Sequence, residues 1–116
     1  MKSAFDTSAL TARAEVAIDV ARKVGREAAR FRREGNPGAL HVENKGLQDF
    51  VTVADRQAEQ AIREGLLARF PDDTFMGEES GGKSGSAGTW VVDPIDGTTN
   101  YIRGFRHWGV SIAFVV

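Results

Sequence analysis

The residues best suited to chemistry follow the apolar run Trp90-Val91-Val92. Asp93 and Asp96 lie three residues apart in Asp-Pro-Ile-Asp-Gly-Thr-Thr-Asn, where proline and glycine indicate a rigid turn. Magnesium prefers carboxylates, carbonyl oxygens and water, so this turn is able to present Asp93, Asp96 and the carbonyl of Ile95 to a metal ion. Asp-Pro and Asp-Gly are also ordinary turn dipeptides, and the two aspartates alone do not separate these interpretations.

Three residues directly after these aspartates suit a phosphate. Gly97, Thr98 and Thr99 are able to start a helical turn, and the first N–H groups of a helix have no partner within it. Such groups bind phosphate oxygens. The sequence therefore predicts that metal and phosphate share one corner of the molecule.

A second acidic motif, Gly77-Glu78-Glu79-Ser80, follows an expected strand over residues 73–76. Taken alone, two glutamates at a strand end indicate a solvated turn. The metal-site interpretation gains weight because the first motif also follows a strand, and sheets gather ligands at strand ends. A Glu78 carboxylate bridging two metal ions would help to activate water and to stabilise a leaving oxygen.

Residues 77–84 also satisfy the Walker A pattern of nucleotide-binding loops letter for letter. We reject that interpretation because such a loop must open a helix, whereas this one leads within a few residues into the strand expected at Trp90. Glu78 and Glu79 would also face the phosphates. His41 and His107 stand alone, and single histidines near strands are more often structural than metal ligands.

A long amphipathic helix must precede these motifs. Apolar or small residues recur at helical spacing from Asp6 to about Glu34, and Gly35 and Pro37 act as stop signals. We assign the basic residues to the opposite face: Arg13, Arg22, Lys23, Arg26, Arg30, Arg32 and Arg33. Acidic residues are interspersed among them (Glu15, Asp19, Glu27 and Glu34), so we favour a solvated face over a nucleic-acid surface.

The remaining elements are short. A strand is predicted over residues 39–42, followed by a turn-like stretch through Lys45-Gly46 and a helix with Thr52 as its N-cap that ends before Pro71. Further strands are expected at residues 73–76, 89–92 and 109–116, with a Gly/Ser loop at 81–88. Two helices followed by strands predict an α+β or layered α/β fold rather than a regular βαβ alternation.

Composition narrows the class further. The 116 residues are 41% apolar and 27% charged, which fits one globular domain or part of one. Fifteen basic and 16 acidic residues give a net charge of -1, so no overall attraction to nucleic acid or to an anionic membrane is expected. The lack of cysteine excludes thiolate sites. With no apolar run long enough for export or membrane insertion, we expect a cytoplasmic protein.

Three motifs together resemble the inositol monophosphatase family: Asp49-Phe50-Val51-Thr52-Val53-Ala54-Asp55, then Gly77-Glu78-Glu79-Ser80, then the segment from Trp90 to Asn100. The resemblance implies the N-terminal part of a layered α/β sandwich of the inositol monophosphatase and fructose bisphosphatase type. Residues 1–116 would be the metal- and phosphate-binding portion of a longer phosphatase. A chain that stops inside the apolar run of residues 111–116 fits this expectation.

The resemblance also implies roles for single residues. Glu78, Asp93, Asp96 and the carbonyl of Ile95 would bind magnesium, while Asp55 and Thr98 would orient and deprotonate the attacking water with Glu78 close by. The residues that would contact substrate are Glu78, Ile95, Asp96, Gly97, Thr98 and Thr99. The family supplies one more metal-binding aspartate, and most contacts to the substrate's alcohol portion, from a C-terminal region that this chain lacks.

The predicted function is magnesium-dependent hydrolysis of a small phosphate monoester, with inositol monophosphate as the first choice. Histidinol phosphate, fructose bisphosphate and phosphoadenosine phosphate are alternatives. A different class is a non-catalytic partner of the transcription machinery, since some members of the family have that role and an arginine-rich helix face would serve it. We expect the complete protein to be a homodimer and the 116-residue fragment to be inactive.

Overall fold

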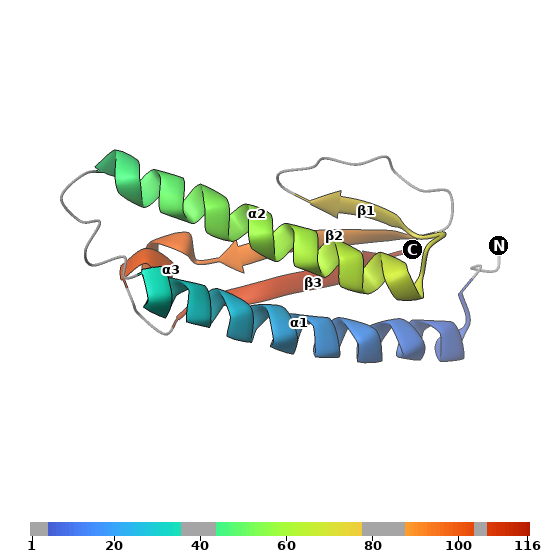
Figure 1. The fold of residues 1–116 in the computed structure, drawn as a ribbon. Coiled ribbons are helices and arrows are strands. Elements are labelled where there is room, and N and C mark those ends of the chain that lie inside the picture. Colours follow the sequence, from blue (N-terminus) through green and yellow to red (C-terminus); the bar gives the residue numbers. More distant parts are fainter. Residues whose placement is uncertain (1–4, 36–43, 78–87, 104–106) are drawn as a thin grey trace.

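The computed structural model describes residues 5–35, 44–77, 88–103 and 107–116. Two long helices precede a small sheet (Figure 1). The elements in chain order are α1 (Thr7–Gly35), α2 (Asn44–Arg69), β1 (Thr74–Gly77), β2 (Thr89–Asp96), α3 (Thr98–Arg103) and β3 (Gly109–Val115). The strand predicted over residues 39–42 and most of the Gly/Ser loop lie outside the described residues.

The sheet is mixed, in the order β1-β2-β3. β1 runs parallel to β2, and β3 runs antiparallel to it. The helices α1 and α2 lie side by side and pack against β3 and β2 respectively (Figure 1). The predicted α+β class is therefore confirmed, and β2 at the centre carries the aspartate motif.

The core lies between the helices and the sheet. Trp90 and Val92 are buried on β2, whereas Val91 between them is 41% exposed, as expected for a strand with one face on the core. From the helices, Val24, Ile62 and Leu66 contribute side chains that are at most 1% exposed. Within the described residues no helix is long and apolar enough to cross a membrane.

The first helix agrees closely with its prediction. Asp6 caps it, since its Oδ1 accepts a hydrogen bond from the Ala9 amide at 2.8 Å. Arg13, however, is not on a solvated face: its guanidinium forms two hydrogen bonds to Asp73, at 2.8 and 2.9 Å, and lies 4.5 and 4.3 Å from the ring centroids of Phe5 and Phe70. A planar guanidinium can both pair with a carboxylate and stack on aromatic rings, which helical periodicity does not reveal.

The second helix begins earlier than predicted. It starts at Asn44, so Thr52 lies within it and is not an N-cap. Gly46 suggested a turn, but one glycine near a helix start costs only about 1 kcal/mol, and Leu47 and Phe50 continue the helical spacing. The predicted end is confirmed at Arg69, directly before Phe70 and Pro71.

Candidate active site

The aspartate motif forms the bulged end of a strand rather than the predicted turn. Asp93 is paired with Ser111, and Asp96 with Gly109, so β2 advances three residues while β3 advances two. Pro94 lies in this step and has no N–H to donate to β3. Positions two apart on β3 lie on the same face of the sheet, so their partners Asp93 and Asp96 also share a face.

Buried apolar residues hold this bulge. Pro94 is less than 2% exposed and Ile95 is 2% exposed. The flanking carboxylates therefore belong to a segment that is fixed by packing and not to a mobile loop. The carbonyl of Ile95, a predicted metal ligand, is part of the same buried segment.

Asp93 has the environment of a metal ligand. Its Oδ1 is buried, and no described residue donates a hydrogen bond to it. A buried carboxylate oxygen without a donor is costly, and a divalent cation would satisfy it. Asp96, on the same face, is exposed and open to ligands. The residues on this face thus fit a magnesium ion.

The third predicted carboxylate, Glu78, lies outside the described residues. Its predecessor Gly77 pairs with Val92 in the parallel β1–β2 ladder. The described part of β1 therefore ends beside the residue that precedes Asp93, as the argument from strand ends predicted. In the part of the chain that the structure describes, no three acidic or histidine side chains converge on a metal-sized space.

The sequence did not single out Glu59, an acidic side chain that lies at this end of β1. Glu59 of α2 is 5% exposed and occupies the space that a Cβ atom on Gly77 would need. It lies one helical turn after Asp55, which is 9% exposed. Two acidic residues at this i,i+4 spacing share a helix face, and this is the sequence signal that would have indicated a second buried carboxylate.

The predicted helical turn after Asp96 is confirmed. Gly97 has a φ of 86°, a left-handed conformation that favours glycine, and α3 begins at the next residue. The Tyr101 amide donates to the Gly97 carbonyl at 3.0 Å, which closes the first turn. Thr98 is half-buried and Thr99 is exposed. The predicted phosphate-binding backbone therefore directly follows the bulge.

Asp55 approaches this region from α2, which packs against both β2 and α3. Its charge acts on Tyr101 of α3: burial raises the pKa of the Tyr101 hydroxyl to about 12, Arg32 opposes that rise, and Asp55 adds to it. Thr98 lies on the same short helix as Tyr101. The fold thus brings together the elements that carry Asp55 and Thr98.

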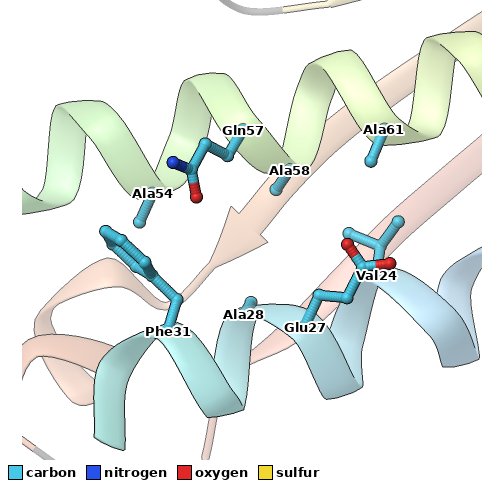
Figure 2. Close-up of a pocket in the computed structure, with 8 residues that line it drawn as sticks. All are labelled: Val24, Glu27, Ala28, Phe31, Ala54, Gln57, Ala58 and Ala61. Atoms are coloured by element: carbon cyan, nitrogen blue, oxygen red, sulfur yellow. The ribbon is translucent and has the colours of Figure 1, made fainter. Parts of the chain in front are cut away.

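Neither histidine is assigned a chemical role. His41 lies outside the described residues, and His107 contributes its backbone carbonyl, which accepts a hydrogen bond from Asn100 Nδ2 at 2.7 Å. A cavity of about 40 Å³ between α1 and α2 has room for little more than water. Figure 2 shows Gln57 of α2 and Glu27 of α1 extending toward the space between the two helices, which the small side chains of Ala28 and Ala58 also line. None of the predicted site residues lines this cavity.

The comparison with known proteins identifies the class: a model of the inositol monophosphatase family matches residues 10–116, and the chain belongs to that family. It is 45% identical over 98 residues to an inositol-1-monophosphatase of Caulobacter vibrioides and 40% identical over 104 residues to the Nus factor SuhB of Pasteurella multocida. These matches cover 83% and 87% of this chain but 38% of each relative, so the chain spans well under half of their length.

A solved structure agrees with the same assignment. The extragenic suppressor protein SuhB of Bartonella henselae superposes with a TM-score of 0.73 at 35% identity, over 90% of this chain and 39% of that one. The expected family and fold are thereby confirmed.

Proposed function

We propose that this chain is the N-terminal metal- and phosphate-binding portion of a magnesium-dependent phosphomonoesterase. The observation that carries the proposal is the bulge in β2. It sets Asp93 and Asp96 on one face of the sheet, and it leaves Asp93 Oδ1 buried with no donor among the described residues. Carboxylate ligands next to a backbone suited to phosphate are the combination that metal-assisted phosphate hydrolysis uses.

The proposed roles of single residues are those that the resemblance to the inositol monophosphatase family implies. Asp93, Asp96, the carbonyl of Ile95 and Glu78 would hold magnesium, which would lower the pKa of water and neutralise charge on the leaving oxygen. Thr98 orients the attacking water and Asp55 accepts its proton. The backbone N–H groups of residues 97–99 bind the phosphate oxygens. Attack by the water oxygen forms one P–O bond as the bond from phosphorus to the alcohol oxygen breaks, and a second water donates a proton to the departing alkoxide.

The substrate we propose is inositol monophosphate, because relatives at 45% and 41% identity are named inositol-1-monophosphatases. Histidinol phosphate, fructose bisphosphate and phosphoadenosine phosphate contain the same phosphate monoester and remain alternatives. Contacts to the alcohol portion would come from the length that relatives have beyond this segment. We further propose that the complete protein is a homodimer.

The test compares Asp93→Asn with the matched control Asp72→Asn, an exposed carboxylate in the turn before β1. In the full-length protein, Asp93→Asn should abolish most magnesium-dependent phosphate release and weaken magnesium binding in calorimetry. Asp72→Asn should change neither property. Normal turnover of Asp93→Asn at saturating magnesium would show that the ligand assignment is wrong.

A second candidate function is binding to the transcription machinery. Two observations favour it: several relatives are named Nus factor SuhB, and α1 carries the exposed basic residues Arg22, Lys23, Arg26, Arg30 and Arg33. Replacing Arg22, Arg26 and Arg30 with glutamine should then spare phosphate release and abolish co-purification with transcription complexes. Unchanged co-purification would remove this candidate.

A further inference from the structure

The short helix α3 depends on other elements for its orientation. It has six residues, which provide too few backbone hydrogen bonds for a helix to be stable alone. It also follows Gly97, which has a left-handed conformation with a φ of 86°. Contacts of its side chains and carbonyls therefore help to determine where Thr98, its first residue, is placed.

Tyr101 supplies the deepest of these contacts. It is 0% exposed, and its hydroxyl donates a hydrogen bond to the Ala28 carbonyl of α1 at 2.8 Å. Its ring meets the ring of Trp108 edge to face, with centroids 5.0 Å apart. Tyr101 lies three residues after Thr98, about one helical turn away, so fixing one fixes the other.

Arg32 of α1 makes a second contact with Tyr101. Its Nη1 donates to the Tyr101 carbonyl at 3.4 Å, and its guanidinium lies 5.7 Å from the centroid of the Tyr101 ring. Arg32 lies one helical turn after Ala28, so neighbouring turns of α1 hold both the hydroxyl and the carbonyl of Tyr101. Two attachment points restrict rotation of α3 about its own axis, which a single contact would not do.

We propose that Tyr101 and Arg32 form a clasp that positions Thr98 relative to Asp55, and that they are positioning residues for hydrolysis. The proposal rests on the proposed function. The helix α2, which carries Asp55, packs against both α1 and α3. A clasp between α1 and α3 therefore sets the distance between Asp55 and Thr98. Besides burial, Arg32 and Asp55 also influence the pKa of the Tyr101 hydroxyl, which Arg32 lowers and Asp55 raises.

The first experiment measures kcat and KM for inositol monophosphate in the full-length protein. Tyr101→Phe keeps the ring and removes the hydroxyl, and Arg32→Lys keeps the charge and removes the planar fork. Each should lower kcat by on the order of 10-fold with little change in KM, since misplacing a reacting group by 1 Å can cost about 10²-fold. The control is Arg33→Lys, the exposed neighbour on α1, which should leave both constants unchanged.

A double-mutant cycle separates positioning from loss of stability. If the clasp acts through Thr98, Tyr101→Phe should lower kcat in the native background and have no further effect in a Thr98→Ala background. Thermal melting of each variant is followed in parallel, and kcat is measured well below the lowest melting temperature. A purely structural role would lower the melting temperature and leave kcat unchanged, and that result would overturn the proposal.

Failure of the clasp and failure of the proposed function give different results. If Asp93→Asn is inactive while Tyr101→Phe and Arg32→Lys keep normal kcat, the metal site stands and the clasp is wrong. If Asp93→Asn keeps normal turnover, the proposed function itself is wrong. If Tyr101→Phe lowers kcat equally in the native and Thr98→Ala backgrounds, the effect does not pass through Thr98 and the clasp is also wrong.

Discussion

At the scale of single residues, close packing around the buried carboxylates limits which substitutions the chain can accept. The clearest case is Gly77, where a Cβ atom would overlap the buried carboxylate of Glu59. Gly77→Ala should therefore destabilise the protein by about 1–3 kcal/mol through overpacking, measured by urea denaturation. The control is Gly25→Ala on α1, where a Cβ atom meets nothing within 4 Å and a gain in stability is expected.

Removing the overlap tests this explanation. In a Glu59→Ala background there is room at Gly77, so the two substitutions together should destabilise the protein by less than the sum of the two alone. Additive losses would mean that Glu59 is not what excludes a side chain at Gly77.

Thr98 is the residue that we propose orients the attacking water. A group that orients the nucleophile matters mainly in the transition state, so Thr98→Ala should lower kcat more than it weakens substrate binding. General-base assistance is typically worth about 10²–10⁴-fold, which sets the expected range, and Thr98→Ser should be milder. A raised KM with unchanged kcat would instead make Thr98 a phosphate anchor only.

At the scale of single residues, the sequence was informative where residue type and spacing alone indicate a chemical role. The spacing and neighbours of Asp93 and Asp96 predicted that a buried strand leads into them, and the structure places both at the end of β2. The inward positions of Arg13 and Arg32 could not be predicted, since they depend on Asp73 and Tyr101, more than 50 residues away in sequence. Glu59 was missed because a polar residue on an amphipathic helix is ordinarily assigned to solvent.

At the scale of elements, strand and helix types were predictable and boundaries were less so. Periodicity identified α1 and the strands, and Pro71 identified the end of α2. The bulge in β2 was not predictable as such, because it depends on the register with β3, which is a property of two strands. The start of α2 was missed because Gly46 is a turn residue in isolation and a tolerated helix residue when neighbours continue the apolar face.

The buried Tyr101 hydroxyl, which joins α3 to α1, should make the free energy of unfolding depend on pH in the alkaline range. Burial raises the pKa of Tyr101 from 10.0 to about 12 in the folded chain, with Arg32 and Asp55 as the charged groups acting on it. Between about pH 10 and about pH 12 the unfolded chain loses this proton while the folded chain keeps it. The folded state then binds more protons, so the free energy of unfolding should fall as pH rises through this window.

Comparing the native chain with Tyr101→Phe isolates this contribution. Below about pH 10 the variant should be less stable, by roughly 1–3 kcal/mol, because the Ala28 carbonyl loses a buried donor. Above that pH the difference between the two proteins should narrow. Urea denaturation at a series of pH values measures the difference in free energy of unfolding between the two proteins. If that difference does not change with pH, Tyr101 ionises as readily in the folded chain as in the unfolded chain.

At the scale of the whole molecule, this segment corresponds to only part of the length of its relatives. It aligns with 38% of the length of the Caulobacter vibrioides relative, and the family resemblance implies one more metal-binding aspartate besides the residues proposed in this segment. The sheet face away from the helices also carries apolar side chains, with Met76 37%, Val91 41% and Val115 54% exposed. Within the described residues β3 pairs with β2 along one edge only.

These features predict that residues 1–116 alone have no magnesium-dependent phosphatase activity. One magnesium ion would be held weakly without its remaining ligand, and the alcohol portion of the substrate would lack the positioning that can supply roughly 7–11 kcal/mol in well-oriented reactions. The unpaired strand edge and the exposed apolar face should also make the segment self-associate. Phosphate release from inositol monophosphate, with and without magnesium, is compared between this segment and the full-length protein, and sedimentation reports association. Equal magnesium-dependent rates would show that this segment already contains the whole active site.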